Sequence, residues 1–316
     1  MIDPNVANAI IYGSLVSMMC VGLTLTYLTT KVPNFAHADF VVTGIYASSL
    51  AFILGNIGSP YFGIPLSFFA GSVSAVAVYL LVLKPMAKRG SSVVSLMVAT
   101  LAVDIIFTGL VGVFIDYVSR VDGRVLQNKG YTLYTLYQLS TDENTLLVVA
   151  PTVLILSVVG IYLLLTRTRF GVAMRASIEN PNLARTLGID VDRVSLFSWF
   201  LAGGFAGLAG GLYAVGFATP QNFPTLLIVD IFAGSVLGGL GSIYGALIGG
   251  FIIGASETYL TTALSTLVGD IYGPGVGSQI VQFEKGIPLA MMIIVLLVAP
   301  QGIVAIRWRR LGRRAV

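Results

Sequence analysis

Long apolar segments alternate with short polar ones along most of the chain. A helix needs about 20 apolar residues to cross the hydrocarbon core of a bilayer, and most of these segments approach that length. The pattern predicts an all-α fold, a polytopic membrane helical bundle with about 8–9 transmembrane or re-entrant segments. The apolar runs lie near residues 8–29, 40–56, 61–83, 92–117, 144–165, 195–216, 226–240, 244–266 and 287–305.

The weakest of these runs is 226–240, which is short, contains Asp230 and ends in a glycine-rich turn. Two topologies therefore fit the pattern. If this run crosses the membrane, the N-terminus lies outside and the C-terminus inside. If it is a re-entrant half-helix paired with its successor, the number of crossings falls to eight and the N-terminus lies inside.

Composition agrees with a membrane protein. The chain has 316 residues, of which 56% are hydrophobic and 10% charged, and its mean hydropathy is +0.90. Soluble domains carry about 25% charged residues, so a soluble globular fold is excluded. Because no polar stretch is long enough for a second domain, we expect residues 1–316 to form a single transmembrane domain.

The positive charges are unevenly distributed between the two sets of polar segments. Fourteen of the 18 lysines and arginines fall in alternate segments, which include the long insert 166–194 and the basic tail 306–316. The positive-inside rule places these segments in the cytoplasm. The protein is therefore expected to be a multi-pass protein of the cytoplasmic (inner) membrane, in contact with lipid, and nucleic-acid binding is not needed to explain its charge.

The insert 166–194 is the longest polar segment between apolar runs. Proline fixes its own φ and disfavours helical geometry in the residue before it, so two short helices are predicted, divided at Asn180 and Pro181. Gly188 is expected to end the second helix. Such a helical bracket on the cytoplasmic surface would suit a docking site for another protein. The alternative is a solvated loop with incidental helix.

Three acidic residues, Asp104, Asp230 and Glu257, fall inside apolar runs. A charge at the bilayer centre costs about 2.5–3.5 kcal/mol, so each is expected to face the bundle interior or a water-filled cavity, or to be protonated. Each is a candidate for a translocation path. The alternative for each is a hydrogen bond to a neighbouring helix or a helix cap.

A further polar site, NFAHADF, lies between the first two apolar runs and holds the one histidine of the chain, His37. Asn34 and Asp39 flank it, and they are expected to cap the helix that follows. All three are further candidates for the path. A lone histidine without a neighbouring cysteine is a poor metal site, so no metal is expected.

Two stripes of glycines at four-residue spacing predict close helix packing, which membrane helices achieve through small residues. The sequence holds neither a phosphate-binding G-x-x-x-x-G-K-[ST] motif nor a recognisable nucleophile with a paired base, so no catalytic residue and no enzymatic activity are expected. The stripes are Gly203, Gly207 and Gly211, and Gly241, Gly245 and Gly249.

Several motifs resemble the permease subunits of ABC importers for branched-chain amino acids, whose relatives transport urea and short-chain amides. The segment FGVAMRASIENPNLARTLGIDVDRV resembles their cytoplasmic coupling loop. The segments GGFAGLAGGLYAVGFATP, FAGSVLGGLGSIYGALIGGFIIGASETY and APQGI follow in the family's order, and NFAHADF with GIYAS resembles the first of two paired permease types. Two positions depart from the family pattern: Ala38 replaces a usual glycine and Ala299 a usual arginine.

The resemblance implies an importer of branched-chain or other apolar amino acids, with a urea or short-chain amide permease as the alternative. Its partners would be a second permease or a second copy of this chain, two ATP-binding subunits that hold ATP and Mg, and an external solute-binding protein. This chain itself would bind no cofactor. An ion-coupled secondary transporter remains the alternative of a different class. The matching coupling positions are Arg175, Glu179, Asn180, Ala184, Leu187 and Gly188.

Overall fold

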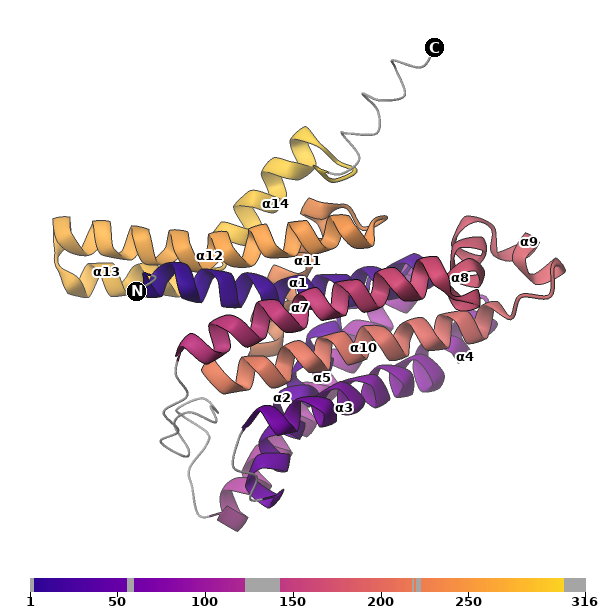
Figure 1. The fold of residues 1–316 in the computed structure, drawn as a ribbon, viewed down its shortest axis with the longest axis horizontal. Coiled ribbons are helices and arrows are strands. Elements are labelled where there is room, and N and C mark those ends of the chain that lie inside the picture. The colour runs from indigo at the N-terminus through magenta and orange to yellow at the C-terminus, as the bar shows by residue number, and fades with distance from the viewer. Residues whose placement is uncertain (1–2, 56–59, 123–142, 218, 220–222, 304–316) are drawn as a thin grey trace.

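A computed structural model describes residues 3–55, 60–122, 143–217, 219 and 223–303 (Figure 1). The basic tail expected at 306–316 lies outside the described residues. The helices, in chain order, are α1 (Pro4–Thr30), α2 (His37–Gly55), η1 (Pro60–Gly63), α3 (Ile64–Val78), η2 (Tyr79–Leu83), α4 (Lys84–Lys88), α5 (Val93–Asp122), α7 (Glu143–Arg167), α8 (Arg169–Glu179), α9 (Pro181–Thr186), α10 (Val191–Gly216), α11 (Phe223–Gly238), α12 (Ile243–Tyr272), α13 (Pro274–Ile280), η3 (Val281–Phe283) and α14 (Gly286–Val298).

The predicted polytopic helical bundle is confirmed. Six helices of the described chain are long and apolar enough to cross a membrane, and the bent pair formed by α13–η3 and α14 makes a seventh if it is one span. The shorter apolar helix α11 has 16 residues and corresponds to the weakest apolar run. The described part of each of the nine apolar runs is therefore largely helical, but the runs do not all become full-length spans.

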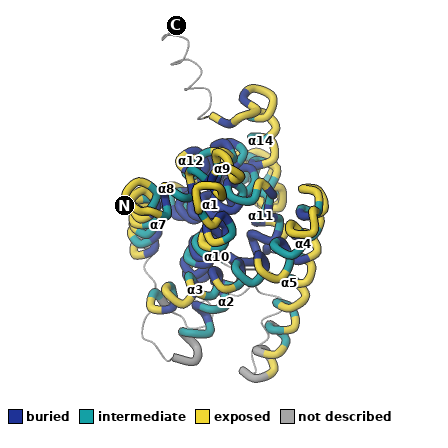
Figure 2. Tube along the Cα trace, turned by 90° about the vertical axis from the view of Figure 1, so that its right-hand side faces the viewer, coloured by how far each residue is buried: buried dark blue, intermediate teal, exposed yellow. Residues whose placement is uncertain are grey.

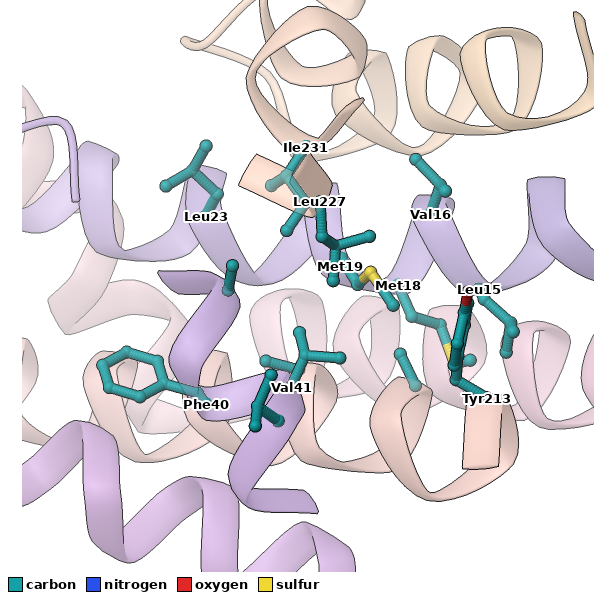
Figure 3. Close-up of a cluster of buried hydrophobic side chains, with 14 of the residues drawn as sticks. Leu15, Val16, Met18, Met19, Leu23, Phe40, Val41, Tyr213, Leu227 and Ile231 are labelled. Atoms are coloured by element: carbon teal, nitrogen blue, oxygen red, sulfur yellow. The ribbon is translucent and has the colours of Figure 1, made fainter. Parts of the chain in front are cut away.

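Helix α1 forms the centre of the bundle, and 83% of its most apolar segment is buried. It packs against α12 on one side and α10 on the other (Figures 1 and 2). Its side chains Leu15, Met19 and Leu23 lie among residues of α2, α10 and α11 (Figure 3). By contrast, only 17% of the corresponding segment of α5 is buried. An apolar helix that remains exposed in this way suits contact with lipid or with another membrane protein.

Glycines bring α10 and α3 into close contact. A Cβ added at Gly203 would meet the Gly71 carbonyl, and one at Gly207 would meet the carbonyl of Ser67. A Cβ at Gly211 would meet the Ser67 hydroxyl. Close approach of backbones maximises van der Waals contact between membrane helices, where burial of apolar surface supplies no driving force.

The second glycine stripe joins α12 to α11, with one exception. Added Cβ atoms at Gly245 and Gly249 would meet the carbonyls of Gly238 and Gly234, respectively. Gly241 differs, because it lies in the turn before α12 and nothing lies within 4 Å of the Cβ position. Gly241 therefore contributes to the turn and not to the packed stripe.

The last apolar run does not form the straight crossing expected at 287–305. Helix α12 continues to Tyr272, and α13 then turns back, beginning at Pro274 after Gly273, whose φ is +101°. The α13–η3 segment meets α14 at an angle of 49°. Lys285 lies at the break between the two halves and reaches into the bundle.

Candidate functional site

A cluster of ionisable side chains connects four helical segments inside the bundle. Lys285 Nζ donates to Asp230 Oδ2 and to Glu257 Oε1, both at 2.6 Å. The hydroxyl of Tyr12 donates to the same Asp230 oxygen at 2.8 Å. These residues come from α1, α11, α12 and the start of α14. Two of the predicted candidates, Asp230 and Glu257, are therefore brought together by a lysine and a tyrosine.

These ionic contacts lie in a largely buried environment. The side chains of Asp230 and Glu257 are 0% and 4% exposed, and that of Lys285 is 18% exposed. The Glu284 carboxylate lies 3.7 Å from Lys285 but is 41% exposed. Two buried carboxylates thus share one ammonium group, an arrangement that compensates their desolvation only in part.

A cavity of about 280 Å³ lies beside this cluster. Glu257 and Lys285 form part of its wall, together with the hydroxyl-bearing Thr258, Thr261 and Thr262 of α12. Aromatic rings form another part of the wall. They belong to Tyr12, Tyr213, Phe217 and Phe223.

The predicted site in NFAHADF packs against α1 and α11, and the ring of Phe35 stacks on that of Phe232 at 4.9 Å. His37, the first residue of α2, is buried, and its Nε2 lies 3.0 Å from the carbonyl oxygen of Met19 near the middle of α1. Helix α2 therefore begins inside the bundle. The Asn34 side chain accepts a hydrogen bond from the amide of Ala36 at 3.2 Å, and so orders the turn before α2.

Asp39 and Asp104 form a second acidic site, separate from the Lys285 cluster. Asp39 is fully buried on α2, whereas Asp104 is half-buried on α5. The Asp104 carboxyl group lies near that of Asp39, and no donor of the described residues reaches either Asp39 carboxylate oxygen. Adjacent carboxyl groups repel when both are ionised, so this site favours binding of a proton or another cation. The sequence candidates for a path thus separate into two groups, one around Lys285 and the other around the start of α2.

The bracket has the local structure that the sequence predicts. Helix α8 ends at Glu179, Asn180 caps α9 by accepting a hydrogen bond from the amide of Leu183 at 3.0 Å, and Pro181 begins α9. Gly188 adopts a φ of +81° after α9 ends. The two helices lie at the end of the bundle opposite the start of α1 (Figure 1).

The predicted coupling residues differ in exposure. Ala184 is only 1% exposed, whereas Leu187 is 72% exposed. Arg175, Glu179 and Gly188 are also exposed, and the Arg175 guanidinium donates to the carbonyl of Leu165 in the last turn of α7. Ala184 therefore packs α9 onto the bundle, and the exposed residues form the free surface of the bracket.

Two cavities flank the bracket. One of about 510 Å³ lies between α8 and the start of α12. The other, of about 440 Å³, is lined by Lys84, Lys88 and Arg185, and Lys84 forms an ion pair of 3.3 Å with Asp192 at the start of α10. The cationic side chains of α4 and α9 thus gather at one end of the bundle, as the positive-inside rule requires of a cytoplasmic face.

The sequence alone did not identify Tyr12 and Lys285 as site residues. The available signal was indirect: a buried carboxylate in an apolar helix needs a partner, and the partner had to come from another segment. Periodicity could not show that α13 turns back and brings Lys285 to Asp230, because this depends on the angle between two short helices.

Together these features define a polytopic α-helical membrane protein with buried ionisable groups, a class typical of transporters. The profile of the family described as "Branched-chain amino acid transport system / permease component" matches residues 5–296. The chain belongs to this family. It is the permease component of an ABC transport system, so ATP hydrolysis belongs to partner subunits, and the family relationship decides against an ion-coupled secondary transporter.

Relatives of the whole chain support the same family. The chain is 41% identical to the probable branched-chain amino acid transport permease protein LivH of Methanocaldococcus jannaschii, over 97% of this chain and 93% of that protein. It is 26% identical to the high-affinity branched-chain amino acid transport system permease protein LivH of Salmonella typhimurium, over 94% and 93%. For the corresponding permease protein BraD of Pseudomonas aeruginosa the identity is 24%, over 95% and 94%.

Proposed function

We propose that this chain forms the membrane path of an ABC importer for branched-chain or other apolar amino acids, in which the bracket α8–α9 receives the movement of an ATPase. The direct attachment of the bracket to two crossing helices is the observation that carries this proposal. Helix α7 ends at Arg167 and only Thr168 separates it from α8, and α10 begins at Val191, four residues after Leu187. Force on the bracket therefore reaches both helices.

The free surface of the bracket is suited to docking. Arg175, Glu179, Asn180, Leu187 and Gly188 are exposed, and Ala184 anchors α9 beneath them. Two ATP-binding subunits would hold ATP and Mg, one of them against this bracket. A second permease, or a second copy of this chain, would complete the path, and an external solute-binding protein would deliver the amino acid to the opposite end.

Uptake of labelled leucine into vesicles tests the substrate. The vesicles contain the transporter complex, ATP and the solute-binding protein, with excess valine, urea or acetamide as competitor. We expect competition by valine alone. Competition by urea or acetamide, or ATP hydrolysis without leucine uptake, would contradict the proposed substrate.

Glu179→Arg tests the coupling surface. The reversed charge lies on the free surface of α8, so we expect the variant to fold and insert normally but to lose ATP-driven uptake. Asp270→Asn serves as the control. Asp270 is an exposed acidic residue near the C-terminal end of α12, away from the bracket. Normal ATP-driven uptake by Glu179→Arg would refute the assignment of the bracket.

A further inference from the structure

The buried charges beside the 280 Å³ cavity do not balance within the described residues. Asp230 and Glu257 carry two negative charges when ionised, and Lys285 supplies one positive charge to both. The two carboxyl groups also interact with each other. Glu284, near the same lysine, adds further negative charge at the rim. The local field therefore favours a second cation and disfavours an anion.

One oxygen of each buried carboxylate is unused. Lys285 and Tyr12 donate to Asp230 Oδ2, and Lys285 donates to Glu257 Oε1. No N–H or O–H group of the described residues donates to Asp230 Oδ1 or to Glu257 Oε2, although both atoms are buried. Glu257 also lines the cavity, and a turn of its carboxylate would bring the free oxygen, which is buried in this structure, to a donor bound there. Buried acceptors of this kind are costly unless a donor reaches them.

We propose that this cavity binds a small apolar solute through its ammonium group, with Glu257 as the anchoring carboxylate and the aromatic wall as the pocket for the apolar part. Lys285 itself shows that an ammonium is stabilised here, because its Nζ lies 5.9 Å from the centre of the Tyr12 ring. Aromatic faces attract cations and also pack against alkyl groups. The rings of Tyr213 and Phe223 are 4.6 Å apart, centre to centre, and form a continuous apolar surface.

The size and position of the cavity fit a single amino acid. Ligand pockets usually measure about 300–1,000 Å³, and 280 Å³ lies just below this range, as suits a ligand smaller than a drug molecule. Tyr12 lies near the start of α1 and Phe217 follows the end of α10, so the cavity is at the end of the bundle opposite the bracket. With the bracket in the cytoplasm, this is the outer half of the protein, where an imported solute arrives.

This inference rests on the proposed function for the identity of the solute, but its chemistry can be tested separately. The purified transporter complex in nanodiscs, without solute-binding protein and without ATP, is examined by saturation-transfer NMR with three ligands. These are leucine, 3-methylbutylamine, which lacks the carboxylate, and 4-methylpentanoate, which lacks the ammonium. Empty nanodiscs provide the blank. We expect saturation transfer to leucine and to the amine, and none to the acid above the blank.

Glu257→Gln keeps the shape of the side chain and removes its charge. We expect the variant to bind the amine about tenfold more weakly or worse, because a hydrogen bond to a charged partner is lost. Asp270→Asn, which removes an exposed carboxylate from the same helix outside the cavity, should leave binding unchanged. If Glu257→Gln does not fold, the comparison of the three ligands on the unmodified complex is enough to decide whether the cavity binds an ammonium group.

Equal binding of the amine and the acid, or undiminished binding of the amine by folded Glu257→Gln, would overturn the proposed ammonium site. The two proposals fail in different ways. If leucine uptake proceeds as expected but the amine and the acid bind equally, only the ammonium site is wrong. If the amine binds as expected but leucine is not transported, the site stands and the assigned substrate is wrong.

Discussion

Lys285 Nζ lies 2.6 Å from Asp230 Oδ2, although 55 residues separate the two along the chain. This ion pair ties the start of α14 to the middle of α11, and the same ammonium group also holds Glu257 of α12. Three segments that are far apart in the sequence are thus joined at one ammonium group. The bend between α13 and α14 places the lysine there.

Replacing Lys285 by methionine should destabilise the protein strongly. Removing one partner of a buried ion pair leaves an uncompensated charge, which costs about 3–5 kcal/mol. We expect a lower unfolding midpoint of the detergent-solubilised protein, measured by fluorescence-detected size exclusion after heating. Lys88→Met, which removes an exposed lysine, is the matched control and should unfold as the unmodified protein does. The pairing would be refuted if both variants unfolded at the same temperature.

The double variant Asp230→Asn with Lys285→Met removes both charges of that pair. Removal of only one charged partner of a buried pair is the costly change, because the other charge is left uncompensated. We therefore expect the double variant to recover part of the stability lost by Lys285→Met. The same heating assay measures the recovery. Strictly additive losses would show that the two residues do not interact.

Gly207→Val should prevent α10 from packing on α3. A Cβ at this position would meet the carbonyl of Ser67, which belongs to a backbone that cannot move aside easily. We expect a large loss of folded protein in the membrane fraction. Gly160→Val on α7 is the control, because nothing lies within 4 Å of its Cβ position. Equal yields of the two variants would contradict the close approach of α10 and α3.

Asn180→Ala should weaken the bracket, whereas Asn180→Asp should preserve it. The Asn180 side chain accepts the hydrogen bond that begins α9, and loss of such a cap costs about 1 kcal/mol. Aspartate keeps the accepting oxygen. We expect less leucine uptake per ATP hydrolysed for the alanine variant, measured in the same vesicles, and a nearly normal ratio for the aspartate variant. Matching ratios for the two would show that the cap does not support coupling.

Gly188→Ala tests the backbone at the end of the bracket. Gly188 has a φ of +81° with nothing within 4 Å of its Cβ position, so the cost of a side chain there is conformational and not steric crowding. A left-handed conformation costs a non-glycine residue about 1–2 kcal/mol, and asparagine adopts it more readily than alanine does. We expect coupling, measured as uptake per ATP hydrolysed, to fall more for Gly188→Ala than for Gly188→Asn.

Gly241→Ala provides the control for that comparison. Gly241 also has open space around its Cβ position, but its φ is not positive. Alanine is therefore expected to leave coupling unchanged at this position. A loss as large as that of Gly188→Ala would show that the conformation of Gly188 is not the reason for its effect.

Local chemistry was enough to predict the bracket. The break at Asn180 and Pro181 and the turn at Gly188 follow from the covalent limits of proline and glycine, which hold in any surroundings. The apolar runs likewise predicted the helical bundle, because a backbone in lipid must satisfy its own hydrogen bonds. The glycine spacing indicated close packing, although it did not exclude Gly241 from the packed stripe.

The sequence by itself thus determined the class of fold, the helical segments, the distribution of positive charge and the shape of the bracket, since each depends on neighbouring residues or on one helix at a time. Only the tertiary structure decided which polar groups meet. Asp230 and Glu257 meet Lys285, Tyr12 meets Asp230, and Asp39 instead lies near Asp104. These pairings depend on the bend between α13 and α14 and on the start of α2 inside the bundle, and hydrophobic periodicity contains no information about such angles.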